Sequence, residues 1–117
     1  MHKLEKIADQ IRHVFDARTV ARDQALSLAR QLTRACSLAI RAVHRDEIEV
    51  MDGHLTEART LADKLRNDLV AHPDLFYAGY TQDALKEFVE ANVTCALIRN
   101  QPLHTPEELD VDRKSVV

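Results

Sequence analysis

The sequence predicts an all-α fold, built as an antiparallel bundle of long helices. The 117 residues contain only two glycines and three prolines, so few positions interrupt a helix. Apolar residues recur at spacings of three and four along most of the chain, and no segment shows the alternation of a strand. The composition, 45% apolar and 30% charged, is typical of a globular helical protein. We therefore expect one helical-bundle domain over residues 1–117.

The first predicted helix runs from about His2 to His44, because no glycine or proline interrupts it. Its apolar residues gather on one arc of the helix and are expected to form its core-facing side. They are Leu4, Ile7, Ile11, Val14, Phe15, Ala25, Leu28, Leu32, Cys36, Ala39, Ile40 and Val43.

The opposite arc of this helix changes sign along its length. It carries Glu5, Asp9, Asp16 and Asp23 first, and then Arg30, Arg34, Arg41 and Arg45. Arginines near a helix C-terminus suit the macrodipole on a solvated face. The same arginines also suit a basic ridge that faces phosphates. Spacing alone favours the solvated face and leaves the ridge as the functional alternative.

The second helix is expected to follow a tight connection, with Asp46 as a possible N-cap, and to run to about Ala71. Gly53 costs about 1 kcal/mol relative to alanine inside a helix, so the regular helix is expected to begin only after it. His72 precedes Pro73 and is thereby disfavoured in helical geometry, which ends the element.

The third long helix is predicted from about Thr81 to Arg99, after a short helix or bend over residues 76–80. It is apolar on nearly every side, so it needs cover from further helices or from oligomerisation. A fourth helix is expected to start at Thr105, with Pro106 at its first position, and it has no length to develop.

An acidic strip marks one edge of this third helix. Asp83, Glu87, Glu90 and Thr94 follow one another at spacings of four, three and four. Two carboxylates one turn apart can hold a hard cation such as Mg²⁺ or Mn²⁺, which can generate a hydroxide and stabilise a phosphodiester displacement. The alternative is that Glu87 and Glu90 lie on a solvated edge of the helix. The pair does not match di-iron bundles, which need a histidine three residues after the glutamate.

Charge and cysteine content limit the classes of function and location. The net charge of −3 gives no overall nucleic-acid signal, so any basic patch must be local. Cys36 and Cys95 stand apart with no metal-binding spacing, and we expect two buried, reduced thiols. No signal peptide and no membrane-length apolar run are evident. These features predict a soluble, cytoplasmic protein without a membrane partner.

Three segments carry a resemblance to a known family. Residues 29–45, ARQLTRACSLAIRAVHR, resemble the first-helix pattern of the translin family. Residues 86–91, KEFVEA, resemble the glutamate signature of its translin-associated factor X branch. Residues 102–109, PLHTPEEL, are similar to the segment that follows in prokaryotic members. The segments occur in the family order and extend over essentially the whole chain.

The resemblance implies a helical bundle that assembles into a hollow, usually octameric shell and binds single-stranded RNA or DNA. For the factor X branch it implies a Mg²⁺-dependent endoribonuclease, with Glu87 and Glu90 as catalytic residues and metal ligands. Arg30, His44 and Arg45 fall on family-like positions, and Arg34 and Arg41 extend the candidate nucleic-acid ridge. Family members continue into further helices, one of which supplies another acid. The chain is therefore expected to be the N-terminal part of a translin-like domain, with an incomplete site.

Two functional alternatives remain open, beside a purely structural helical adaptor. The first is a binding-only module of the same shape, which holds phosphates through the arginines without catalysis. The second is an all-α nucleoside triphosphate pyrophosphatase, suggested by Glu87 and Glu90 followed by Glu107 and Asp110. The prolines around this second acidic pair make the pyrophosphatase the weaker alternative.

Overall fold

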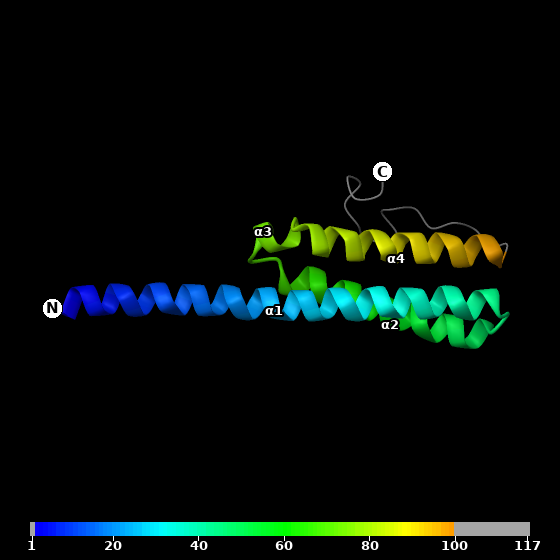
Figure 1. Cartoon of the computed structure of the whole chain (residues 1–117), viewed down its shortest axis with the longest axis horizontal. Helices are drawn as coiled ribbons and strands as arrows, with labels where there is room; N and C mark the ends of the chain where they lie inside the picture. Colours follow the sequence, from blue (N-terminus) through cyan, green and yellow to red (C-terminus); the bar gives the residue numbers. More distant parts are fainter. Residues whose placement is uncertain (1, 100–117) are drawn as a thin grey trace.

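The computed structural model describes residues 2–99 and confirms the all-α prediction. It contains α1 (His2–His44), α2 (Ile48–Asp68), α3 (Pro73–Phe76) and α4 (Gly79–Ile98). No strand occurs among these residues. Helix α2 runs back along α1, and α4 then runs in the same direction as α1 (Figure 1). Helix α1 packs extensively on both α2 and α4, whereas α2 and α4 touch each other far less. Helix α1 thus provides most of the packing surface for both α2 and α4.

The core lies along the C-terminal half of α1 and combines small and large apolar residues from all three long helices. Small side chains on α1 let the partner helices approach closely, and Leu65, Leu85 and Phe88 fill the space between them. The buried α1 positions are Ala25, Leu28, Ala29, Leu32, Ala35, Cys36, Ala39, Ala42 and Val43.

The reversal between α1 and α2 differs from the sequence expectation. Asp46 is not an N-cap: it adopts φ 61°, in the left-handed region that aspartate tolerates better than most residues. Glu47 takes the N-cap position without a side-chain cap bond. Its backbone N–H donates to the carbonyl of Ala42 over 2.9 Å and closes the reversal. The turn is therefore held by backbone geometry rather than by a capping carboxylate.

Helix α2 begins at Ile48, so the expected start after Gly53 is wrong. Met51 is only 1% exposed and anchors this first turn in the core, which offsets the cost of the glycine. The helix ends at Asp68, before the expected Ala71. Pro73 occupies the first turn of α3, where its missing N–H costs little.

The N-terminal arm, residues 2–20 of α1, extends beyond the bundle (Figure 1). All its residues are exposed, so the prediction that its apolar residues belong to the core is wrong. The exposed fractions are 59% for Leu4, 51% for Ile7, 49% for Ile11, 68% for Val14 and 64% for Phe15. The periodicity of the arm is that of a buried face, but α2 and α4 are too short to cover these five side chains.

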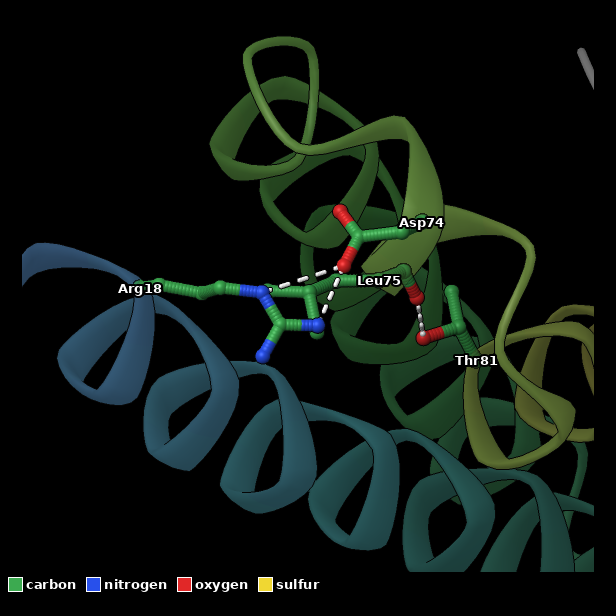
Figure 2. Close-up of polar contacts among 4 residues, drawn as sticks. All are labelled: Arg18, Asp74, Leu75 and Thr81. Atoms are coloured by element: carbon green, nitrogen blue, oxygen red, sulfur yellow. Dashed lines mark hydrogen bonds and ion pairs between the residues drawn. The ribbon is translucent and has the colours of Figure 1, made fainter. Parts of the chain in front are cut away.

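Helix α3 closes the bundle at the base of the arm (Figure 2). Arg18 of α1 donates hydrogen bonds from its guanidinium group to Asp74 of α3. The buried hydroxyl of Thr81, in the first turn of α4, donates to the carbonyl of Leu75 over 2.8 Å. The short helix or bend expected over residues 76–80 is a short helix that lies earlier, at Pro73–Phe76, and Gly79 and Tyr80 already belong to α4. It connects three helices at one end of the bundle.

Helix α4 begins at Gly79 and ends at Ile98, close to the predicted limits. Among the described residues, its far end lacks the cover that the sequence analysis expects from further helices or from oligomerisation. Leu97 is 63% exposed and Ile98 is 44% exposed. The expected helix start at Thr105 lies outside the described residues. None of the helices described over residues 2–99 is both long and apolar enough to cross a membrane.

Candidate functional site

A groove of about 350 Å³ lies between α1 and α4, beside the acidic strip. Both helices contribute four residues to it. They are Leu26, Ala29, Arg30 and Thr33 from α1, and Tyr80, Asp83, Ala84 and Glu87 from α4. The groove therefore joins two features that are more than fifty residues apart in the sequence, the basic arc of α1 and the acidic strip of α4.

Two alanines explain why the groove forms at this level. Ala29 and Ala84 are both buried where the helices meet, and their short side chains allow close approach. Longer polar side chains one residue away then stand at the rim. On α4, Asp83 and Glu87 are four residues apart and share one face. On α1, Arg30 follows Ala29 and faces outward from the same seam.

The charges of the groove are divided between its two walls. Arg30 lies on the α1 wall, and Asp83 and Glu87 lie on the α4 wall. All three side chains are exposed. None of them forms an ion pair or hydrogen bond with another residue in the part of the chain that the structure describes. One cation and two anions are thus available to a ligand in the same groove.

Tyr80 adds a polar group that the sequence analysis missed. Its hydroxyl is buried and has no hydrogen-bond partner among residues 2–99, although the residue lines the groove. A buried hydroxyl without a partner is uncommon in a folded protein. Helical spacing could have found it, because Tyr80 precedes Asp83 by three residues and Glu87 by seven and so shares their face.

The predicted acidic strip is only partly assembled into this groove. Asp83 and Glu87 line it, whereas Glu90 is exposed one turn further along and is not among its lining residues. Thr94 is half-buried nearer the end of α4. Asp83, Glu87 and Glu90 are all exposed, as in the alternative that places the glutamates on a solvated edge of the helix.

The predicted basic residues are separated in a similar way. Arg30, Arg34, Arg41, His44 and Arg45 are all exposed on α1 or directly after it. Of these five, only Arg30 lines the groove. The other four lie further toward the C-terminal end of α1, so they could extend a contact with a long ligand but do not share the same cavity.

The groove has the donor chemistry for a weakly held hard cation. Mg²⁺ is commonly bound by one or two carboxylates, with water and substrate phosphates completing its shell. Asp83 and Glu87 provide two such carboxylates on one wall. Within residues 2–99, no three histidine, cysteine, aspartate or glutamate residues are grouped closely enough to hold a metal by themselves. The residues present therefore fit a Mg²⁺ shared with a bound phosphate, not a closed metal cage.

Both cysteines are buried and free, as the sequence predicts. Burial, with smaller contributions from the nearby charges of Glu87 and Cys95, raises the pKa of the Cys36 thiol to about 12. Burial also raises the pKa of Cys95, against an opposing effect of Arg99. The effect of Glu87 on Cys36 places this carboxylate close to the α1–α4 seam. Thiols with raised pKa values are poor nucleophiles, so neither cysteine is a candidate for catalysis.

The second acidic pair of the pyrophosphatase alternative, Glu107 and Asp110, lies outside the described residues. The same holds for residues 102–109, one of the three segments that carry the family resemblance. The groove thus rests on α1 and α4 alone.

Comparison with known proteins identifies one similar protein of unknown activity. The chain is 35% identical over 71 residues to an uncharacterized protein of Methanocaldococcus jannaschii. The matched region is 60% of this chain and 31% of that protein, so the chain corresponds to less than a third of its relative's length. No family model matches the chain, and no solved structure matches it significantly.

Proposed function

We propose that the chain binds single-stranded RNA or DNA along α1 and α4 and, with Mg²⁺ (or Mn²⁺) held at Glu87, cleaves RNA as an endoribonuclease. The observation that carries this proposal is the shared groove, which places the unpaired Arg30 opposite the unpaired Asp83 and Glu87. The resemblance of residues 29–45 and 86–91 to the translin family supports the same function. Such a protein would act in the cytoplasm.

Phosphate binding is assigned to α1. A guanidinium group without an internal ion pair can bind a phosphate in a bidentate manner. Arg30 meets that condition in the groove, and Arg34, Arg41, His44 and Arg45 continue the exposed basic residues along and just beyond the helix. A single strand that follows α1 would meet these groups in turn. Tyr80 lies on the wall opposite Arg30 and lines the same groove.

The metal is assigned to the acidic strip, with Glu87 as the central ligand. Glu87 shares the groove with Asp83 and lies one turn from Glu90, so it belongs to both possible carboxylate pairs. A bound Mg²⁺ would supply an activated water and offset the charge that develops on the phosphate oxygens. The protein's own residues would position the strand, with Arg30 on one side and the carboxylates on the other. Thr94 is a supporting residue at the far end of the strip.

A binding-only module remains the second candidate function. It is favoured by the observation that no third acid joins Asp83 and Glu87 within residues 2–99. In that case Arg30 and the other basic residues would hold phosphates, and the carboxylates would only set the position of the strand. The two functions share the groove and differ in whether RNA is cut.

Equilibrium binding of a fluorescent single-stranded RNA at several salt concentrations tests the shared part of the proposal. Arg30→Ala is expected to weaken binding and to reduce the salt slope by about 1, because one phosphate contact is lost. The control is Lys64→Ala, which removes an equal exposed charge from α2. Equal affinities of Arg30→Ala, Lys64→Ala and the unchanged protein would reject the groove as the binding site.

A further inference from the structure

Six of the eleven exposed large apolar side chains among the described residues lie on the N-terminal arm. Leu4, Ile7, Ile11, Val14 and Phe15 are between 49% and 68% exposed, and every other residue from 2 to 20 is also exposed. A contiguous apolar stripe of this kind marks an interaction surface. This surface is separate from the groove, so the inference below is independent of the proposed function.

The spacing of the stripe indicates that its partner is another helix. Leu4, Ile7, Ile11 and Val14 follow one another at three, four and three residues, which is the pattern of the a and d rows of a coiled coil. Continued along α1, the same rows become the surface that packs on α2 and α4. The buried members of these rows are Ala25, Leu28, Leu32, Ala35, Ala39 and Ala42. The arm is thus a direct extension of an existing helix-packing surface.

Arg18 marks the end of the free part of this surface. It occupies the next position of the same rows after Val14 and is held by Asp74 of α3 (Figure 2). Beyond it, the bundle's own helices cover the face. The open surface therefore extends over residues 2–17, a length that one more arm of the same kind can cover.

We propose that two copies of this chain associate through their arms, which pair as antiparallel helices. In this pairing Leu4 packs opposite the partner's Val14, and Ile7 packs opposite the partner's Ile11. The two-fold axis between the copies generates each of these two contacts twice. The apolar stripe of one arm is therefore complementary to the same stripe on the other arm. The interface thereby covers the apolar residues that the bundle leaves exposed.

The area and the direction of the helices favour this arrangement. Five large side chains that are about half exposed on each of two arms give a buried area on the order of 1,000 Å², the lower limit for a specific interface. A parallel pair would bring both bundles to the same end, where α2 and α4 already cover the a and d rows. An antiparallel pair keeps the bundles at opposite ends of the arms.

The charges at the base of the arm are complementary to the start of a partner arm. A groove of about 520 Å³ between α1 and α2 is lined by residues that include Asp16, Ala17 and Asp68. The antiparallel pairing brings the partner's Lys3 opposite Ala17 and beside Asp16. The rows that flank the apolar seam hold Gln10 and Ala8 near the two-fold axis, so no like charges meet there.

The mass of the protein in solution, measured by light scattering, tests the proposal. The unchanged chain is expected to show twice the mass of one chain, and Ile7→Gln with Ile11→Gln is expected to reduce it to one. The matched control is Glu5→Gln with Asp9→Gln, which places the same residue on the outer face of the arm and is expected to stay dimeric. A single-chain mass for the unchanged protein, or a double mass for the Ile7 and Ile11 variant, would overturn it.

Disulfide trapping then tests the direction of the helices and does not depend on the glutamine variants. Mixed Leu4→Cys and Val14→Cys chains are expected to cross-link to each other, whereas Leu4→Cys alone is not expected to cross-link to itself. The native cysteines are buried and should not interfere. Self-linking of Leu4→Cys would overturn the antiparallel pairing. If the protein is a monomer that binds anionic lipid vesicles through Ile7 and Ile11, the proposal that a second copy covers the arm is overturned.

Discussion

Arg18 of α1 donates two hydrogen bonds to the same carboxylate oxygen, Oδ2 of Asp74 in α3, and so links residues 56 positions apart. The pair lies where the bundle ends and the N-terminal arm begins (Figure 2). It holds α3 against the long helix and occupies the row that the apolar stripe would otherwise continue. The contact therefore separates a part of α1 that is covered within the chain from a part that is not.

This ion pair should make stability depend on pH in the acid range. The hydrogen bond from Arg18, together with its charge, lowers the pKa of Asp74 below its ordinary value of 3.8. Because the pKa of Asp74 is lower in the folded than in the unfolded protein, the ion pair stabilises the fold at pH values above the unfolded-state pKa. This contribution is lost as the pH falls through the folded-state pKa. Asp74→Asn is thus expected to lower the melting temperature near neutral pH by a small amount that disappears in stronger acid. Thermal scans across this range measure the difference.

The matched control for Asp74 is Asp9→Asn. Asp9 pairs with Arg12 on the same exposed arm and joins no two helices, so its replacement should change the melting temperature little at any pH. A melting difference for Asp74→Asn that persists unchanged in strong acid would show that the ion pair is not its source.

Thr81 should be a more important residue for stability than its small size suggests. Its hydroxyl is fully buried and donates to the carbonyl of Leu75. Thr81→Val keeps the shape but leaves that carbonyl with only the longer hydrogen bond from the backbone N–H of Ala78, at 3.3 Å. The loss of the buried hydroxyl bond is expected to cost about 0.5–1.5 kcal/mol of unfolding free energy. Chemical denaturation measures this change. Thr56→Val removes a similar hydrogen bond on an exposed surface, to Asp52, and is expected to change stability by less than about 0.5 kcal/mol.

The thiol groups should be unreactive in the folded protein. Burial raises the pKa of Cys36 to about 12 and also raises that of Cys95, so little thiolate exists at neutral or mildly alkaline pH. A thiol reagent is expected to modify neither residue in the native protein and both after unfolding. Rapid modification of Cys36 in the native state would contradict its placement in the core.

The local periodicity of the sequence predicts where the helices lie, but it does not predict which helices pack against one another. The long first and last helices follow from uninterrupted apolar spacing, and both lie close to their expected limits. The start of α2 does not, because the burial of Met51 outweighs the local cost of Gly53. The information that the sequence lacks is which residues of other helices Met51 packs against.

The same distinction applies to the arm and the groove. Leu4 and Leu28 occupy the same apolar pattern, yet only Leu28 has helices to pack against, since α2 and α4 do not extend as far as Leu4. The acidic strip follows from helical spacing, whereas its exposure and its position opposite Arg30 depend on the alignment of α4 along α1. Tyr80 lies on the same face of α4, and helical spacing alone predicts that position.

The central claim is tested most directly by cleavage of single-stranded RNA with and without Mg²⁺. The account predicts Mg²⁺-dependent cleavage that is lost in Glu87→Gln and retained in Glu49→Gln, an exposed glutamate on α2 away from the groove. Asp83→Asn and Glu90→Gln then show which carboxylate acts with Glu87. Cleavage that persists in Glu87→Gln at the rate of the unchanged protein would contradict the account, and binding without cleavage would leave the groove as a binding site only.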